Sequence, residues 1–249
     1  MRLEVAFSPE AVDPDCLAGH TAIVIDILRA TTTMCAALHH GARAVIPTGS
    51  PDEARATAQR VEKGDVLLAG ERNAVPIPGF DLGNSPGDMT RQRVEDKTVV
   101  MSTTNGTQAL LAAASARAVY PGAASNFSLL AARARQAIDA DGTLVILCAG
   151  RAGTFGLDDA YCAGRLVMAT LNGGGRDSRE GLNDAAIAAL ELAGRFGARW
   201  DVPLRLSAAG RQLERLGFGD DIDDAAQEDG FPSFIRFQDG RVTLAPESP

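Results

Sequence analysis

The sequence predicts a three-layer α/β/α fold built on a largely parallel or mixed β-sheet. Short apolar runs typical of buried strands recur along the 249 residues, and segments with helical character separate most of them. Strands that alternate with helices usually pair in parallel and are covered on both faces. Polar turns follow several of these strands, and folds of this class bind ligands beyond the carboxyl ends of the strands. The functional site is therefore expected at that edge of the sheet.

The predicted strands and helices alternate along most of the chain. Strands are predicted over residues 2–7, 22–28, 42–47, 66–69, 98–101, 116–121 and 143–148, where apolar residues alternate or run together. Helices are predicted over residues 34–40, 51–62, 108–114, 125–140, 157–171, 180–196 and 207–216. A C-terminal hairpin joins 233–238 to 241–244 through Asp239-Gly240, a pair that favours a tight turn.

Two further segments have no predicted regular structure. Residues 73–88 are rich in proline and glycine, and a loop of this length is predicted to be functional, with a plain surface loop as the alternative. The acidic stretch at 219–230 is predicted to be a solvated face, because it lacks the glycine placement and terminal glutamate of a calcium loop.

Two parts of the sequence share one design, a strand followed by a Thr-rich turn, a helix and a second strand. The first has its turn at 29–33 and the second at 103–107. We interpret them as an internal βαβ duplication, with chance similarity in an Ala-rich chain as the alternative. In the second turn, Gly106 lets the backbone approach a ligand, and hydroxyl and helical N–H groups point inward. Such a turn suits an oxyanion such as phosphate.

Length and charge limit the organisation of the chain and its partners. The chain can form a single domain over 1–249 or two α/β subdomains, at about 1–140 and 141–249. A net charge of −8 argues against nucleic acid or an anionic membrane as a partner. A phosphorylated substrate stays open, because an arginine cluster or a bound metal reverses the sign within one site. A homodimer is expected only from the base rate among soluble enzymes.

The cysteines and the hydropathy pattern favour a reducing cytoplasm. The spacing of Cys16, Cys35, Cys148 and Cys162 matches neither a disulfide framework nor a zinc motif. The last three lie in apolar surroundings and are expected to be reduced core residues. The apolar runs are too short to span a bilayer, and no signal-peptide pattern is recognised.

Charged side chains are expected to meet at the carboxyl edge of the sheet. The set comprises Asp26, Glu71, Asp158 and Asp159 with Arg29, Arg72 and Arg151. Such carboxylates suit Mg²⁺, and guanidinium groups bind phosphate oxygens through a planar fork. Five of the seven have a structural alternative: Asp26 caps a turn, Glu71 and Arg72 form a surface ion pair, and Asp158 and Asp159 complement a helix dipole. Together they predict metal-assisted phosphoryl transfer or hydrolysis, with Asp26 as nucleophile or general base.

Several motifs lie at or after the predicted strands. They are Val24-Ile25-Asp26-Ile27-Leu28-Arg29-Ala30-Thr31-Thr32-Thr33, Gly70-Glu71-Arg72, Gly79-Phe80-Asp81-Leu82-Gly83-Asn84-Ser85-Pro86, Thr103-Thr104-Asn105-Gly106-Thr107 and Cys148-Ala149-Gly150. In this order they resemble the motifs of the 2-phosphosulfolactate phosphatase family. The resemblance covers about residues 26–164 and is less clear in the C-terminal third.

This resemblance implies a Mg²⁺-dependent phosphatase that converts 2-phospho-3-sulfolactate to 3-sulfolactate and phosphate, in its best-known setting a step towards coenzyme M. The residues and the resemblance together assign catalytic roles to Asp26, Arg29 and Arg72, substrate binding to Thr31, Thr32, Asn84, Thr103, Thr104, Asn105, Gly106, Thr107 and Arg151, and metal binding to Asp26, Glu71, Asp158 and Asp159. Where the resemblance leads us to expect Glu-Asp, this chain has Asp158-Asp159, and the shorter first side chain weakens its case as a ligand.

Other functions are consistent with the same residues. A nucleotide-dependent oxidoreductase needs Gly-x-Gly-x-x-Gly after a strand, whereas residues 150–156 match only Gly-x-x-Gly-x-x-Gly. A non-catalytic binder of phosphorylated metabolites and a phosphatase for another small phospho-acid are further alternatives. Phosphate release with and without Mg²⁺ separates a binder from an enzyme.

Overall fold

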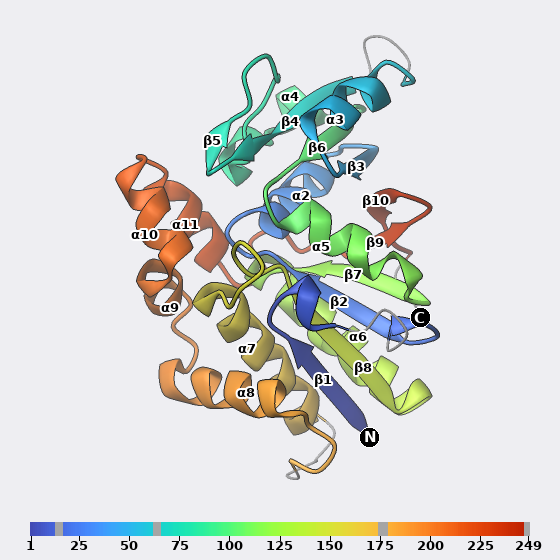
Figure 1. Cartoon of the computed structure of the whole chain (residues 1–249), viewed down its shortest axis with the longest axis vertical. Helices are drawn as coiled ribbons and strands as arrows, with labels where there is room; N and C mark the ends of the chain where they lie inside the picture. Colours follow the sequence, from blue (N-terminus) through green and yellow to red (C-terminus); the bar gives the residue numbers. More distant parts are fainter. Residues whose placement is uncertain (13–16, 62–65, 174–178, 247–249) are drawn as a thin grey trace.

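The computed structural model describes residues 1–12, 17–61, 66–173 and 179–246, which contain one mixed, 10-stranded sheet (Figure 1). The strands are β1 (Arg2–Ala6), β2 (Thr21–Ile25), β3 (Ala44–Thr48), β4 (Val66–Arg72), β5 (Val75–Pro76), β6 (Thr98–Ser102), β7 (Ala118–Gly122), β8 (Thr143–Cys148), β9 (Ile235–Gln238) and β10 (Arg241–Leu244). Their order across the sheet is β1-β8-β2-β7-β9-β10-β3-β6-β4-β5. The predicted α/β fold with a mixed sheet is confirmed.

Helices connect most of the strands and dominate the region after β8. They are α2 (Ala30–His39), α3 (Pro51–Ala58), α4 (Arg91–Val94), α5 (Gly106–Ala112), α6 (Phe127–Asp141), α7 (Leu157–Gly173), α8 (Asp184–Phe196), α9 (Asp201–Leu206), α10 (Ala208–Arg215) and α11 (Gly219–Ala226). Each predicted helix is present, whereas α4, α9 and α11 were not predicted. In α9, Pro203 lies in the first turn, where a proline costs no helical hydrogen bond.

Helices cover both faces of the sheet, which explains its apolar strands. In β2, Ile23 and Ile25 belong to a core with residues of α6, α7 and α8. The intervening Ala22 and Val24 belong to a second core with residues of α2 and α5. All four side chains are fully buried. A strand buried on both faces has no polar face, so the α/β/α layering follows from the composition of the strands.

The sheet consists of two parallel halves joined by an antiparallel hairpin. One half contains β1, β8, β2 and β7, and the other contains β3, β6 and β4. The hairpin β9–β10 pairs with each half at one residue, Phe237 with Val119 and Val242 with Val45. Its turn at 239–240 has positive φ angles of 51° and 74°, which confirms the predicted tight turn. The carboxyl ends of both halves face a common region beside α10 and α11 (Figure 1).

The two predicted units cross between these halves. The unit β2-α2-β3 starts in one half and ends in the other, and β6-α5-β7 makes the return crossing. As a result, β2 pairs with β7 and β3 pairs with β6. The two turns also share a contact: Thr31 Oγ1 accepts a hydrogen bond from the Asp26 N–H (3.1 Å), as Thr107 Oγ1 does from the Thr103 N–H (3.2 Å). These correspondences support the predicted duplication, although each strand of one unit pairs with a strand of the other unit.

Two segments differ from their predicted character. Residues 219–226 form α11, in which Asp221 and Ile222 are buried, so the prediction of a solvated face is wrong for one side of this segment. The reason is that α11 packs one face against the rest of the molecule. Residues 73–88 include β5 and the short 3₁₀ helix Pro86–Asp88.

The described cysteines agree with the prediction of reduced core residues. Cys35, Cys148 and Cys162 are free and buried, and burial raises the pKa of each thiol. Cys16 lies outside the described residues. None of the helices in the described part of the chain combines the length and apolar character that crossing a bilayer requires.

Candidate active site

A cavity of about 180 Å³ lies where the carboxyl ends of the two halves meet. Of the predicted site residues, those that line it are Asp26, Arg29, Glu71, Asn84, Thr104, Asn105, Arg151 and Asp159. Those that do not line it are Thr31, Thr32, Arg72, Thr103, Gly106, Thr107 and Asp158. The cavity thus brings together residues at or just after the carboxyl ends of β2, β4, β6 and β8, the edge of the sheet where the site was expected.

Asp26 follows β2 directly and is 7% exposed. Its Oδ1 accepts a hydrogen bond from the N–H of Ala30 (3.1 Å), the first residue of α2. Its Oδ2 accepts no hydrogen bond from the residues that the structure describes, and this atom is not enclosed. Burial raises the pKa of Asp26 to about 7, the Ala30 N–H opposes this shift, and Glu71 and Asp158 add charge repulsion. Asp26 therefore offers one free carboxylate oxygen to the cavity.

Both carboxylate oxygens of Glu71 are held by the backbone. Oε1 accepts a hydrogen bond from the Thr104 N–H and Oε2 from the Ala74 N–H, each at 2.7 Å. The Thr104 hydroxyl adds a contact of 3.1 Å to Oε2. Because Glu71 is buried, the alternative of a surface ion pair with Arg72 is wrong. Glu71 instead joins the end of β4 to the Thr-rich turn after β6.

The two aspartates at the start of α7 have different surroundings. Asp159 accepts hydrogen bonds from the Ile27 N–H (2.9 Å) and the Gly150 N–H (3.0 Å), so it links the turns after β2 and β8. Burial raises its pKa, and neighbouring carboxylates add to the shift. Asp158 lines an adjacent cavity of about 260 Å³. Burial raises the pKa of Asp158 to about 6, against backbone hydrogen bonds and the charge of Arg151.

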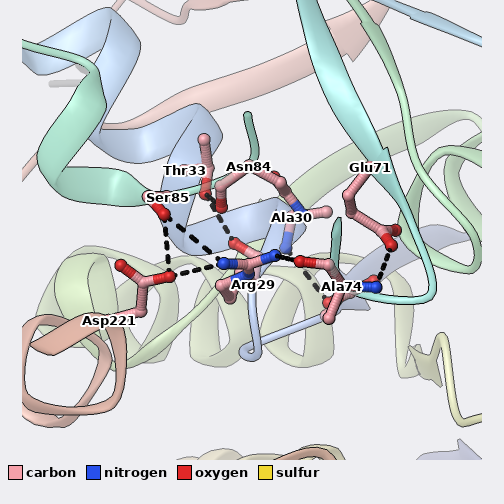
Figure 2. Close-up of polar contacts among 9 residues, drawn as sticks. Arg29, Ala30, Thr33, Glu71, Ala74, Asn84, Ser85 and Asp221 are labelled. Carbon is pink, nitrogen blue, oxygen red and sulfur yellow. Dashed lines mark hydrogen bonds and ion pairs between the residues drawn. The ribbon is translucent and has the colours of Figure 1, made fainter. Parts of the chain in front are cut away.

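Arg29 is 3% exposed and has several partners within the protein (Figure 2). Its Nη1 lies 2.5 Å from Asp221 Oδ2, and its Nη2 donates to the carbonyl of Ala74 (3.0 Å). Ser85 Oγ lies 3.4 Å from Nη1 and donates to Asp221 (2.9 Å). The ring of Phe218 lies 4.8 Å from the guanidinium carbon. Arg29 therefore joins the start of α2 to the 73–88 segment and α11, with its charge balanced by a carboxylate.

The other two predicted arginines have different surroundings. Arg72 donates to the carbonyl of Glu71 (2.7 Å) and to Ser102 Oγ (2.9 Å), away from the cavity lining. Arg151 lines both cavities, and its Nη2 donates to Gln212 Oε1 (2.8 Å). Within the described residues, Arg151 makes no ion pair within 4.0 Å. Arg151 can therefore pair with an anionic ligand, whereas Arg29 is already paired with Asp221.

Gly106 lies where the helices α2 and α5 begin. A Cβ atom at this position would lie 2.5 Å from both the Cβ of Ala30 and the Oδ2 of Asp26. Glycine is thus required by the contact between two helix N-termini, a reason that the sequence did not reveal. Thr103 and Thr107 bond to each other beside it, with the Thr107 N–H 3.0 Å from Thr103 Oγ1, and both are almost fully buried.

The cavity has oxygen atoms suited to a metal ion. Asp26 Oδ2 and the buried Asn84 Oδ1 have no hydrogen-bond partner among the described residues. Carboxylate and amide oxygens are ligands that Mg²⁺ accepts beside water and substrate oxygens. In the described ranges, no group of three or more His, Cys, Asp or Glu side chains is arranged to hold a metal. These residues therefore fit Mg²⁺ bound through few side chains and the substrate, and not a complete protein cage.

Sequence reasoning missed three residues that shape this site. Asn73 and Gln212 line the cavity, and Asp221 pairs with Arg29. Asp221 stands in the acidic stretch, where Ile222 and Ala225 at helical spacing were the available sign of a buried face. No pattern around Gln212 distinguishes it from an ordinary surface residue.

The covered sheet, the cavity at its carboxyl ends, and the free carboxylate and guanidinium groups are typical of an α/β enzyme that acts on an anionic substrate. A family model described as 2-phosphosulpholactate phosphatase matches residues 6–240, and the chain belongs to this family. The family name denotes phosphoric monoester hydrolases, so the protein is an enzyme of that class.

Curated relatives agree with this family over most of their length. A protein of Symbiobacterium thermophilum is 40% identical over 92% of this chain and 95% of its own length. Relatives in Deinococcus radiodurans (42% identical, 91% of this chain, 89% of theirs) and Clostridium novyi (35% identical, 92% and 94%) are similar in extent. Each of the three is named "Probable 2-phosphosulfolactate phosphatase".

Proposed function

We propose that this protein hydrolyses 2-phospho-3-sulfolactate to 3-sulfolactate and inorganic phosphate, with Mg²⁺ as cofactor. The observation that carries the proposal is the cavity with Asp26 and Arg151 in a chain of this family. The substrate has a phosphate, a sulfonate and a carboxylate, so its binding requires cationic and N–H donors even in an acidic protein.

Asp26 is the residue proposed to act on the phosphoryl group. Its free Oδ2 either takes a proton from the attacking water or attacks phosphorus itself. The Ala30 N–H holds the other oxygen and fixes the direction of the carboxyl group. The net reaction forms a bond between phosphorus and a water oxygen, breaks the bond from phosphorus to the C2 oxygen, and returns a proton to that oxygen.

Donors around the cavity are proposed to bind the substrate oxygens. Arg151 supplies a guanidinium group, whereas the single proton of the Thr104 hydroxyl is donated to Glu71 Oε2. Asn105 Oδ1 accepts a hydrogen bond from the Ala152 N–H (3.3 Å), which orients the side chain so that its NH₂ group is free to donate. Glu71 and Asp159 are proposed to support the site by holding its turns, because each of their oxygens accepts a backbone N–H.

The carboxylate of Asp26 and Asn84 Oδ1 are proposed to hold Mg²⁺. Asp26 Oδ1 keeps a lone pair beside the Ala30 N–H, so Oδ2 stays free for the reaction. When bound, the ion supplies positive charge that stabilises the phosphoryl oxygens beside several carboxylates. A reducing cytoplasm is the proposed compartment, supported by the free cysteines, and a route towards coenzyme M is the proposed setting of the product. The homodimer and the division into domains stay predictions.

Phosphate release from a panel of phosphomonoesters tests the function and the cofactor. We expect turnover of phosphosulfolactate with Mg²⁺, a loss of about two orders of magnitude or more after verified metal removal with EDTA, and recovery on adding Mg²⁺. Full turnover without metal would refute the proposal that Mg²⁺ is the cofactor. Faster turnover of phospholactate than of phosphosulfolactate would favour another phospho-acid as substrate, and binding without phosphate release would favour a non-catalytic binder.

Metal binding has a readout that does not depend on turnover. Because a ligand of the folded state raises the unfolding midpoint, Mg²⁺ should raise that of the wild type. The shift should shrink in Asn84→Ala, which lacks the amide oxygen. An equal rise of the unfolding midpoint in the two proteins would show that Asn84 is not a metal ligand.

A further inference from the structure

The C-terminal helices hold the two cavity arginines in different ways. Asp221 of α11 pairs with Arg29, with 2.5 Å between Oδ2 and Nη1. Gln212 of α10 accepts a hydrogen bond from Arg151, with 2.8 Å between Oε1 and Nη2. A carboxylate neutralises the guanidinium that it holds, whereas a neutral amide fixes its orientation and leaves its charge intact. The protein therefore holds one arginine in a direct ion pair, whereas the other makes no ion pair within 4.0 Å among the described residues and has Asp158 as a more distant charge.

Gln212 uses both ends of its amide. While Oε1 accepts from Arg151, Nε2 donates to the carbonyl of Asn73 (3.0 Å). All three residues line the cavity, so these contacts cross its rim from the turn after β4 to the turn after β8. The opposite amide orientation would set donor against donor and acceptor against acceptor. A glutamate at this position would lose the bond to Asn73 and would neutralise Arg151.

Arg151 stands between the cavity that contains Asp26 and the adjacent cavity of about 260 Å³. The adjacent cavity is lined in addition by Arg211, Ser207 and Asp158. An arginine on this boundary is placed to contact the part of a ligand that extends away from Asp26. In the proposed substrate, that part is the carboxylate or the sulfonate, because the phosphate must reach Asp26.

We propose that Gln212 is a positioning residue that directs Arg151 to the non-transferred carboxylate or sulfonate of the substrate. The identity of that substrate rests on the proposed function. The C-terminal helices then take part in substrate selection: phosphoesters with a second anionic group bind better than phosphoesters without one. The charge that Arg151 retains is the physical basis of this preference.

Two substitutions at Gln212 and one matched control test the proposal. Gln212→Glu keeps the shape and adds a charge against Arg151, and Gln212→Met keeps the length without the hydrogen bonds. Gln136→Glu adds the same charge on the exposed face of α6 beside Arg133, outside the cavity lining. Each variant is assayed with phosphosulfolactate and with phenyl phosphate, which has no second anionic group. Thermal unfolding checks that each variant is folded.

In Gln212→Glu, we expect the KM for phosphosulfolactate to rise about tenfold or more, as for the loss of hydrogen bonds to a charged group. Its kcat should change by less than about threefold, the pattern of lost binding that is equal in ground and transition states. The KM for phenyl phosphate should change by less than about twofold, and Gln212→Met should fall between wild type and Gln212→Glu. An equal rise for both esters, or no rise in either folded variant, would overturn the proposal.

Calorimetric binding of 3-sulfolactate separates this proposal from the proposed reaction. The product has both non-transferred anionic groups and needs no turnover, so Gln212→Glu should weaken its binding by about the same factor as the KM effect. A wild type that binds 3-sulfolactate but releases no phosphate would refute the reaction and leave the role of Gln212 intact. A wild type that hydrolyses phosphosulfolactate, with unchanged 3-sulfolactate binding in both variants, would refute the role of Gln212 alone.

Discussion

The turn after β2 and the turn after β6 have the same backbone contacts and different chemistry. In each, a threonine in the first helical turn accepts a hydrogen bond from the N–H of the residue that follows the strand. That residue is Asp26 in one turn and Thr103 in the other. Asp26 Oδ1 accepts from the Ala30 N–H, and Thr103 Oγ1 accepts from the Thr107 N–H. Asp26 keeps a second oxygen free of hydrogen bonds among the described residues, whereas Thr103 is almost fully buried.

This difference shows how two similar units can contribute different features to one site. The first helix residue of each unit, Ala30 in α2 and Gly106 in α5, meets the other beside Asp26. The first unit supplies the carboxylate, and the second supplies the space beside it by lacking a side chain.

Asp26→Asn should have the largest effect on activity. The substitution keeps the shape of the side chain and its hydrogen bond to the Ala30 N–H, but it removes the charge. Turnover should fall by roughly two to four powers of ten, as for the loss of a general base or metal ligand. Kinetics with phosphosulfolactate and thermal unfolding measure the two effects separately. Near-normal turnover would show that Asp26 only caps its turn, as Thr103 does.

Gly106→Ala tests the space supplied by the second unit. The added Cβ would be too close to Ala30 and Asp26, so we expect a stability loss of about 1–3 kcal/mol and lower turnover as Asp26 is displaced. Gly194→Ala in α8 is the matched control, because no atom lies within 4 Å of a Cβ there. Denaturant unfolding and phosphate release are the measurements.

A second substitution shows whether the effect of Gly106→Ala comes from this contact. Ala30→Gly removes the opposing Cβ, so the double variant should recover part of the stability and turnover lost in Gly106→Ala. Strictly additive losses would show that the two helix ends do not constrain each other.

Thr103→Val should have the smallest effect on activity. Valine matches the size of threonine but cannot accept the hydrogen bond from the Thr107 N–H, so we expect a stability loss of about 1–2 kcal/mol. Turnover should change by less than about threefold, because Thr103 does not line the cavity. A loss of turnover comparable to that of Asp26→Asn would show that both turns act directly in the reaction.

Local patterns predicted most of the fold, and a cavity lies at the edge of the sheet where the site was expected. The tight turn at 239–240 and the apolar strands depend on neighbours in sequence, so they were predicted correctly. One general rule, that ligands bind beyond the carboxyl ends of the strands, predicted that Asp26, Glu71 and Arg151 lie near one another. The crossing of the two units was not predictable, because strand order depends on contacts between residues far apart in the chain.

The roles of single side chains were harder to predict than their location. The metal-ligand role of Glu71 stays a prediction, whereas its hydrogen bonds from the backbone N–H groups of Thr104 and Ala74 had no sign in the sequence. Arg72 follows Glu71 immediately but turns toward Ser102. Asp221 and Gln212 come from helices far along the chain, and their partners are defined only when the tertiary structure forms.

The hairpin β9–β10 affects how the protein is made. It stands in the middle of the sheet, yet it follows the other strands in the chain, so the ribosome must extend the polypeptide past residue 244 before the halves can be joined. Until then, β7 and β3 each expose an edge that is able to pair with another chain. The sheet of a nascent chain is therefore completed late, by contacts between residues far apart in the sequence. Pairing of this kind is intrinsically slow and exposes the chain to aggregation.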